Sequence, residues 1–408
     1  MEQIRSCRCL IFLLGALALI LFSGCAASKS DIVISQSELP AHPRLAELQA
    51  VEPVEKNGLT EFNGSKKYVK DGVPVILLRG SPYEMGYARG VLLKKELRQW
   101  TVDNLTMIKK MAFGNIGLSM LHSRTEELSR FIPDQYRQEL KGLSAGASID
   151  YDTLLMLNVL DTIGKQFACT STAVKDENGH ILRSRGLDFK DLKYFRPSML
   201  FIYRPDNGNA FASLGPPGII GVLTAINEEG LTFGVHDIFA AGLEWRGIPA
   251  GMLYRTVVES ADTVDEAGRI IKNANRSVAQ MALVTDPGDA AVFEFTHDEF
   301  GKIEMTESPL ILTNHTRAID EGRKYKNSIN RFHEAASFFN KAGNRVTLDK
   351  LVELHRMPLI SREKNPTPSL NIHSAVFNSN TLDFRVAIGA HPASKGQWHE
   401  FNLKEELD

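Results

Sequence analysis

The chain has 408 residues, of which 43% are hydrophobic and 24% are charged, and these values are ordinary for a globular protein. This length could hold two or three average domains, although large α/β enzymes often fill it with one composite core. Its 47 Lys and Arg residues nearly balance its 49 Asp and Glu residues, giving a formal net charge of −2. The sequence shows no basic stripe of the kind that neutralises phosphates, so nucleic acid is excluded as an expected partner.

The first 25 residues have the features of an export signal. A basic start is followed by an apolar run of signal-peptide length, which ends in Leu21-Phe22-Ser23-Gly24-Cys25. This ending resembles the lipobox of bacterial lipoproteins, with Phe22 where that motif usually has Leu. The resemblance implies a lipoprotein-type signal peptide over 1–25, lipid on Cys25 as the membrane anchor, and an exported protein of the bacterial cell envelope. A plain secretory signal or an uncleaved anchor is the alternative, but the apolar run is short for a spanning helix.

The next part of the chain is predicted to be a tether followed by a helical presegment. Residues 26–66 are polar and interrupted by prolines and by Asn63-Gly64, a pattern typical of a tether. A short strand is expected over 73–78, and a helix after Gly80. Apolar residues recur at helical spacing over about 101–113 and 118–146. Residues 67–168 are therefore predicted to be a mainly helical presegment.

From Cys169 onward the apolar period changes from about 3.6 to 2, so strands dominate residues 169–408. Helices are expected over about 263–272, 321–341 and 347–356, the first with a capping-box start at Thr263. Strands are expected over about 198–203, 210–214, 219–226, 231–237, 281–285, 290–295, 309–314, 373–378 and 382–388. This order predicts an α+β fold of antiparallel sheets packed together with helices outside.

Asn178-Gly179 predicts a tight hairpin, because both residues tolerate the positive φ that a two-residue type I′ turn needs. With that turn, Cys169 lies directly opposite Asp188 at the open end of the hairpin. In the same ladder Arg185 points away from the face that carries Cys169. A bulge or twist near Gly186 would then be needed to bring its side chain in.

Cys169 stands apart from the other cysteines of the chain. Cys7, Cys9 and Cys25 all belong to the signal region, so Cys169 would be the free thiol of an exported protein. A lone cysteine there is either reactive or a buried, inert side chain. If the chain were cut just before Cys169, the new α-amine would lie beside the thiol and could take its proton.

Cys169, Arg185 and Asp188, at offsets of sixteen and nineteen residues, resemble the N-terminal-nucleophile (Ntn) hydrolases of the choloylglycine hydrolase superfamily. That group includes bile-salt hydrolase, penicillin V acylase, acid ceramidase, N-acylethanolamine acid amidase and the acyl-coenzyme A:6-aminopenicillanic acid acyltransferase branch. The likeness covers roughly 74–405. It implies an αββα sandwich, self-cleavage between Ala168 and Cys169, and a small-molecule N-acyl amide as substrate. Its other matching pieces are Gly80-Ser-Pro-Tyr-Glu-Met-Gly86, Ile226-Asn-Glu-Glu-Gly-Leu231, Thr313-Asn314-His315, Asn327-Ser-Ile-Asn-Arg331 and Ser374-Ala-Val-Phe-Asn378.

The resemblance also implies roles for the nucleophile and its neighbours. Cys169 is the nucleophile and its α-amine the base, Asp188 binds that amine, and Arg185 lies against the thiol and the substrate. Asn314 is the side-chain donor to the oxyanion. Apart from this motif, Asn314 could simply be the polar residue that ends an apolar strand.

Two further positions complete the expected site. His236 falls where relatives often carry an asparagine that lines the oxyanion pocket. A histidine in a strand could equally be a core residue whose ring nitrogens are hydrogen-bonded within the protein. Arg331 best fits the late arginine of the relatives, and Arg323 is the rival. The histidines show no metal-ligand spacing, and neither a metal nor another cofactor is expected.

The sequence thus predicts an amidohydrolase that cleaves linear amides through an acyl thioester on Cys169. The alternatives are an acyltransferase, in which an amine resolves the same thioester, and a surface binding lipoprotein whose cysteine is structural. The acyl group could be a fatty acid, a bile acid, a phenoxyacetyl group or a peptide, and the sequence predicts no oligomeric state.

Overall fold

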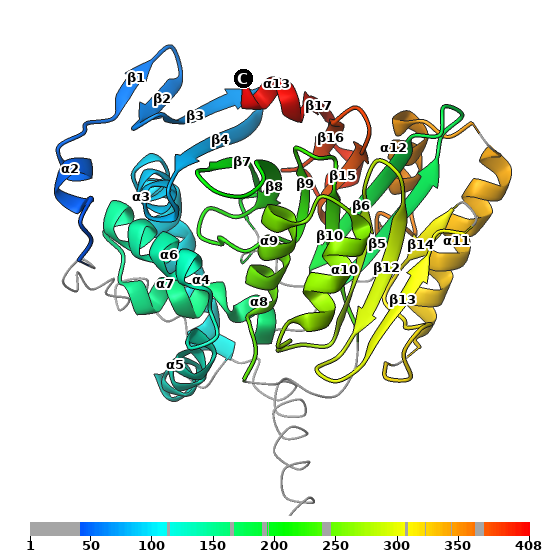
Figure 1. Cartoon of the computed structure of the whole chain (residues 1–408), viewed down its shortest axis with the longest axis horizontal. Coiled ribbons are helices and arrows are strands. Elements are labelled where there is room, and N and C mark those ends of the chain that lie inside the picture. Colours follow the sequence, from blue (N-terminus) through cyan, green and yellow to red (C-terminus); the bar gives the residue numbers. More distant parts are fainter. Residues whose placement is uncertain are drawn as a thin grey trace, which may run out of the picture.

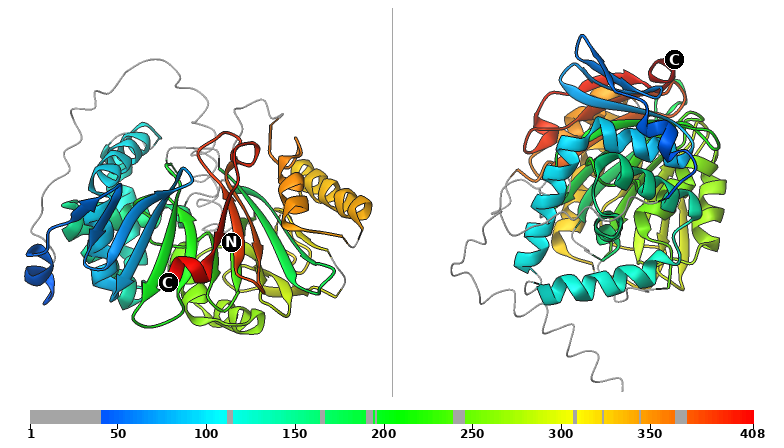
Figure 2. Two further views of the ribbon diagram at one scale, coloured as in Figure 1. Left: turned by 90° about the horizontal axis from the view of Figure 1, so that it is seen from above. Right: turned by 90° about the vertical axis from the view of Figure 1, so that its left-hand side faces the viewer.

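The computed structural model describes residues 41–111, 115–163, 167–189, 194, 196–238, 246–306, 309–322, 324–343, 345–363 and 371–408. The signal peptide, Cys25 and Arg323 lie outside these ranges, so the predictions made for them stay predictions. Two β-sheets pack face to face, and helices cover the outer side of each sheet (Figures 1 and 2). The predicted αββα sandwich is confirmed.

The larger sheet has the strand order β1-β2-β3-β4-β7-β8-β9-β10-β11-β12-β13. Its first four strands come from the part of the chain before Cys169 and the rest from the part after it. The strands are β1 (Val54–Lys56), β2 (Leu59–Phe62), β3 (Ser65–Lys70), β4 (Val73–Gly80), β7 (Met199–Pro205), β8 (Phe211–Gly215), β9 (Thr224–Asn227), β10 (Thr232–Asp237), β11 (Gln280–Thr285), β12 (Ala290–Phe295) and β13 (Phe300–Glu304).

The smaller sheet has the order β14-β5-β6-β15-β16-β17. Its members are β14 (Leu310–Leu312), β5 (Phe167–Lys175), β6 (Ile181–Phe189), β15 (Asn371–Asn378), β16 (Asp383–Ala387) and β17 (His399–Asn402). Every residue of β6 and β15 is buried, because these strands are covered on one face by the larger sheet and on the other by helices.

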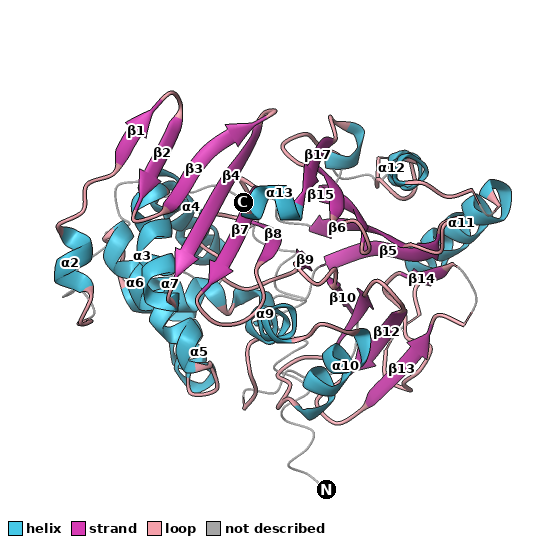
Figure 3. Ribbon diagram, turned by 45° about the horizontal axis from the view of Figure 1, so that its top comes forward, coloured by secondary structure: helices cyan, strands magenta, loops and turns pink. Residues whose placement is uncertain are grey.

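Helices form the two outer layers (Figure 3). On the larger sheet, α3 packs on β4, α9 on β9 and β10, and α10 on β11 and β12, whereas α11 and α12 pack on the smaller sheet. The helices are α2 (Leu45–Gln49), α3 (Pro82–Leu92), α4 (Lys94–Met111), α5 (Asn115–Ser129), α6 (Asp134–Ala147), α7 (Tyr151–Asn158), α8 (Leu160–Ile163), α9 (Ala250–Ser260), α10 (Val264–Asn273), α11 (Lys326–Ala342), α12 (Leu348–Arg356) and α13 (Leu403–Leu407), with a 3-10 turn, η3, over Ala393–Lys395. No helix in these described ranges is long and apolar enough to cross a membrane.

The tether predicted over 26–66 is wrong for its second half, which folds into α2 and strands β1 to β3. Three two-residue turns, Asn57-Gly58, Asn63-Gly64 and Asp71-Gly72, connect β1 to β4, and all six residues have positive φ. This is the backbone of a type I′ hairpin turn, which asparagine, aspartate and glycine adopt most readily. The polar residues of this segment therefore belong to hairpins at the edge of the sheet.

The presegment is built into the body of the protein. Strand β4 lies between β3 and β7, and it pairs with β7 in parallel along six residue pairs. Arg89 of α3 is fully buried and donates to the carbonyl oxygens of Pro216, Pro217 and Ile219. In the same interface Arg255 of α9 forms a buried ion pair with Glu139 of α6, at 2.6 Å. The parts before and after Cys169 thus share one sheet and one core.

Candidate active site

The hairpin of β5 and β6 carries the predicted nucleophile, and its turn differs from the prediction. Gly179 has a φ of 82°, but Asn178 does not have a positive φ. The Asp176 carboxylate accepts from the backbone N–H groups of Asn178 (2.9 Å) and His180 (2.8 Å). This side chain stabilises a type I turn followed by a left-handed glycine, and the loop has three residues in place of two.

The longer loop shifts the ladder by one residue, so the predicted opposition of Cys169 and Asp188 is wrong. Cys169 pairs with Leu187, and Asp188 pairs with Ala168. Arg185 lies opposite Ser171, two residues from Cys169 along β5. Because side chains alternate along a strand, Arg185 and Cys169 share the face that looks toward the larger sheet. The bulge expected near Gly186 is therefore not needed, and the β5–β6 register is regular there.

Asn314 and Arg331 converge on the backbone of Cys169. Asn314 follows β14, and its Oδ1 accepts from the backbone N–H of Cys169 at 2.8 Å. Arg331 on α11 donates to the Cys169 carbonyl oxygen, to Thr170 Oγ1 (2.9 Å) and to Asn314 Oδ1 (2.8 Å). Asn314 and Arg331 are both completely buried. The bond between Ala168 and Cys169 is thus held on the Cys169 side by two residues that the sequence singled out.

The thiol of Cys169 is in an environment that keeps it protonated. Burial raises the pKa of Cys169 to about 11, the nearby positive charge of Arg185 opposes this rise, and the carboxylates of Asp188 and Asp237 add to it. At neutral pH the intact chain therefore holds a neutral thiol, and a base is required to make the thiolate that attacks carbonyl groups.

Asp188 lies on the other side of the hairpin from the thiol, near two arginines. Burial raises the pKa of its carboxyl group, whereas the charges of Arg362 and Arg331 and a hydrogen bond from Asn371 Nδ2 (3.1 Å) oppose that rise. Arg331 Nε and Arg362 Nη1 both donate to Asn327 Oδ1, at 3.0 and 2.7 Å. The carboxylate therefore has one hydrogen-bond donor and the positive charges of two arginines nearby.

His236 joins the two sheets beside the nucleophile. Burial, together with the charge of Arg185, lowers the pKa of His236 well below its ordinary value, so the ring is neutral. Its Nδ1 is 2.8 Å from the carbonyl oxygen of Thr313, which can only accept, so Nδ1 carries the proton. Its Nε2 then accepts from Ser171 Oγ at 2.8 Å. Both ring nitrogens are thus engaged within the protein, and its predicted place in the oxyanion pocket stays a prediction.

Several residues of the site were not predicted. Asn327 and Tyr325 accompany Arg331, and burial raises the pKa of Tyr325 to about 12 in a position where the charges of Arg331 and Cys169 both act on it. Asn327 was part of a quoted motif, so its spacing from Arg331 could have indicated it. Arg362 lies in a stretch with no recognisable pattern, and Asp237, whose carbonyl oxygen accepts from Asn314 Nδ2 at 2.9 Å, ends a strand without any motif.

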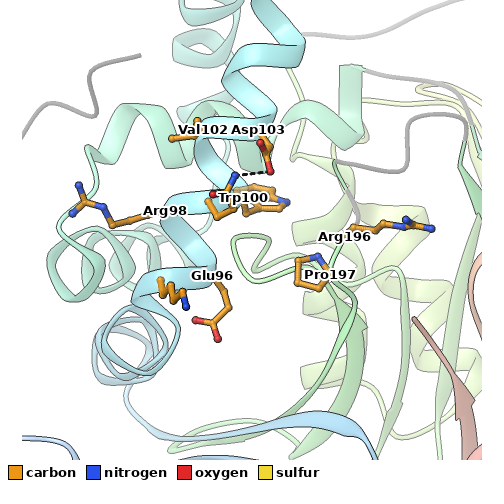
Figure 4. A pocket seen from close by; sticks show the side chains of 9 residues that line it. Glu96, Arg98, Trp100, Val102, Asp103, Arg196 and Pro197 are labelled. Atoms are coloured by element: carbon orange, nitrogen blue, oxygen red, sulfur yellow. Dashed lines mark hydrogen bonds between the residues drawn. The ribbon is translucent and has the colours of Figure 1, made fainter. Parts of the chain in front are cut away.

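A separate cavity of about 720 Å³ lies between α4 and residues 196–197. Figure 4 shows Trp100 and Asp103 of α4 facing the side on which Arg196 and Pro197 lie. Its lining includes side chains of both charges and none of the predicted site residues. It is therefore distinct from the site around Cys169. Among the residues described by the structure, no three or more His, Cys, Asp or Glu side chains are grouped so as to hold a metal ion.

Comparison with curated proteins gives relatives of low identity. The chain is 26% identical over 276 residues to an uncharacterized protein of Archaeoglobus fulgidus, covering 57% of this chain and 46% of that protein. It is 26% identical over 245 residues to Protein dcd1A of Dictyostelium discoideum, covering 50% and 54%. It is 20% identical over 177 residues to acid ceramidase of Mus musculus, covering 37% and 44%. The chain spans about half the length of the curated relatives it matches.

Similar solved structures include the Caenorhabditis elegans ortholog of N-acylethanolamine-hydrolyzing acid amidase, with 17% identity, coverage of 52% of this chain and 93% of that chain, and a TM-score of 0.42. Penicillin V acylase from Agrobacterium tumefaciens has 15% identity, coverage of 58% and 87%, and a TM-score of 0.44.

A family model described as acyl-coenzyme A:6-aminopenicillanic acid acyl-transferase matches residues 179–391. The match begins in the turn after β5, so it includes Arg185, Asp188, Asn314 and Arg331 but not Cys169. It spans more than half of the chain, and the predicted family is confirmed: the chain belongs to the acyl-coenzyme A:6-aminopenicillanic acid acyl-transferase family.

Proposed function

We propose that this member of the family is an autoprocessed amidohydrolase whose N-terminal nucleophile is Cys169 and whose substrates are linear N-acyl amides. The observation that carries the proposal is the meeting of Asn314 and Arg331 on the backbone of Cys169, with Arg185 on the same face as the thiol. A structural cysteine requires neither a fixed amide and an arginine on its own backbone nor a second arginine beside its thiol.

Maturation would begin with attack of Cys169 Sγ on the carbonyl carbon of Ala168. The C–N bond of that peptide breaks, the Cys169 nitrogen takes up a proton, and the Ala168 acyl group becomes a thioester. Water then attacks the thioester, which frees the Ala168 carboxylate and restores the thiol. The new α-ammonium group would stand where the Cys169 N–H now donates to Asn314, within reach of the negative charge of Asp188.

Turnover would use the freed α-amine as the base. The neutral amine takes the thiol proton, the sulfur attacks the substrate carbonyl, and the oxyanion is stabilised by fixed donors, among which Asn314 is our assignment. The amine product leaves with the proton, and water resolves the acyl thioester to a carboxylic acid. Arg185 favours the thiolate throughout, since its positive charge lowers the pKa of the thiol.

The first experiment is expression of the chain without residues 1–25 beside its Cys169→Ala variant, followed by a denaturing gel and N-terminal sequencing. We expect two chains in the wild type only, the larger one beginning Cys-Thr-Ser-Thr. Intact chains in both samples would remove the support for an N-terminal nucleophile. Hydrolysis of a panel of fatty-acyl, bile-acid, phenoxyacetyl and peptide amides by the processed protein then identifies the acyl group.

An acyltransferase is the second candidate, and the description of the matching family favours it. In that reaction an amine in place of water attacks the thioester, and the nucleophile is unchanged. Incubation of the processed protein with an N-acyl amide and a second amine separates the two, because only a transferase yields a new amide in preference to the free acid. A binding lipoprotein without activity would show neither processing nor turnover.

We also propose that the protein is exported and anchored by lipid on Cys25. The support is the signal-like sequence over 1–25 alone. Metabolic labelling with palmitate should mark the wild type and not Cys25→Ala, and an unlabelled wild type would leave plain secretion as the better account.

A further inference from the structure

Two arginines on β6 form a buried cationic pair between the sheets. Arg183 and Arg185 have no exposed surface, and their alternate positions on β6 direct both toward the larger sheet. Arg183 lies opposite Ala173 on β5 and Phe377 on β15, and its Cζ atom is 5.7 Å from the centre of the Phe377 ring. The immediate neighbours of Arg183 within its own sheet are therefore apolar.

The nitrogens of this pair are poorly satisfied, in contrast to those of other buried arginines. Within the described part of the chain, Nε, Nη1 and Nη2 of Arg183 and Nη1 and Nη2 of Arg185 have no hydrogen-bonding oxygen or nitrogen. The fully buried Arg89, Arg255 and Arg331 donate to backbone carbonyls, carboxylates or a side-chain amide. The pair differs from these three because, in the described part of the chain, neither guanidinium group forms an ion pair or donates to a backbone carbonyl.

Gly234 of β10 brings the two side chains together from the opposite sheet. A Cβ atom at position 234 would stand 1.9 Å from Nη2 of Arg183 and 3.1 Å from Cδ of Arg185. The absence of a side chain on Gly234 therefore makes room for both arginines. The polar groups near Arg185 include Thr224, whose Oγ1 is 3.4 Å from Nε, the neutral His373 bonded to that hydroxyl at 3.0 Å, and the Cys169 thiol, whose pKa the charge of Arg185 lowers.

We propose that Arg183 and Arg185 form a buried binding site for a small monovalent anion such as chloride. An unpaired charge inside a protein is strongly destabilising, and the charged group that acts on Arg183 is Arg185, which repels it. A guanidinium group offers planar, always-charged donors that suit an anion. Because the backbone of Gly234 lies close to Arg183 Nη2, a compact anion suits the pair better than a bulky acyl substrate. This inference does not depend on the proposed amidase activity.

The test measures unfolding of the full chain carrying Cys169→Ala, so that proposed cleavage does not complicate the transition. Chloride is exchanged for gluconate at constant ionic strength. Above the dissociation constant of one site, we expect the folding equilibrium constant to rise about tenfold for each tenfold increase in chloride. This response should disappear in Arg183→Met and persist in Arg98→Met, which removes an arginine exposed on α4. An equal chloride response in all three chains would overturn the proposal.

A second measurement keeps the proposal testable if Arg183→Met fails to fold. Crystals of the full Cys169→Ala chain grown in bromide should give an anomalous difference peak within hydrogen-bonding distance of the Arg183 or Arg185 guanidinium. A water molecule in that place, or no peak, would exclude the anion.

Discussion

Replacement of Arg331 by methionine is the sharpest test of the site, because this one side chain holds both the peptide to be cut and the expected oxyanion donor. Methionine keeps much of the apolar stem and removes the donors to Cys169 O, Thr170 Oγ1 and Asn314 Oδ1. Asn314 Oδ1 keeps the N–H of Cys169, but the other two buried acceptors lose a donor each. At about 1–3 kcal/mol for each unsatisfied group, unfolding free energy should fall by about 2–6 kcal/mol.

The effect on cleavage should be larger than this loss of stability explains. Loss of an oxyanion donor costs about 10²–10³ in rate, and Asn314 without Arg331 loses one of the hydrogen bonds that hold its side-chain amide in place. We therefore expect processing to slow by about 10²–10³. Since Arg331 also lowers the pKa of Asp188, the pH dependence of the remaining processing should move toward higher pH.

The assay follows the appearance of the chain that starts at Cys169 on denaturing gels over time. Stability is measured separately by denaturant unfolding of Arg331→Met in the Cys169→Ala background, in which no cleavage is expected. Arg356→Met, an exposed arginine on α12, is the control for arginine loss as such. Processing of Arg331→Met at the wild-type rate would refute the reasoning, whatever its effect on stability.

Three further predictions concern pH, packing and the presegment. Burial lowers the pKa of His355 and of His373 to about 3, so the fold keeps both neutral while the unfolded chain binds protons below about pH 6.5. Their joint contribution to stability should be full above that pH and fall by about 2.7 kcal/mol per pH unit toward pH 3, in addition to the contribution of the likewise neutral His236. Gly142→Ala should lower unfolding free energy by about 1–2 kcal/mol after its gain in helix propensity, because a Cβ there would stand 2.1 Å from the Tyr83 carbonyl oxygen. If the chain is cut after Ala168, an affinity tag on the C-terminal chain should retain the presegment in non-denaturing buffer, since β4 pairs with both β3 and β7.

Each of these has its own control. His355→Leu removes a side chain whose Nε2 has no hydrogen-bond partner among the described residues, so the acid slope should fall by about 1.4 kcal/mol per pH unit. An unchanged slope would assign it to other groups. Gly215→Ala, where no atom lies within 4 Å of the added Cβ, should leave stability unchanged, and an equal loss at Gly142 and Gly215 would contradict the packing argument. Release of the presegment in buffer would show that the shared sheet is weaker than its pairing indicates.

The sequence predicted the layers of the fold and most of the helices and strands that form them. Its change of apolar period at Cys169 marked the start of the sheet-rich part, and the strands expected over 231–237, 281–285 and 290–295 are present within about one residue. It missed α9 and the edge hairpins, although Asn57-Gly58 and Asn63-Gly64 carried the signal for type I′ turns. The same dipeptide led to a wrong prediction at Asn178-Gly179. There the Asp176 carboxylate accepts hydrogen bonds from the backbone N–H groups of Asn178 and His180 and stabilises a different turn.

That single turn illustrates what the sequence alone determines about this protein and what it leaves to the tertiary structure. Residue types and spacing indicated Cys169, Arg185, Asp188, Asn314 and Arg331, since the chemistry of a thiol nucleophile requires such groups. They could not give the face on which each side chain lies, because a one-residue change in loop length reverses every side chain of a strand. The meeting of Arg331 with Cys169 and the approach of Arg362 to Asp188 depend on how α11 and the chain after α12 pack against the smaller sheet. Such contacts join residues far apart in sequence, and no local pattern encodes them.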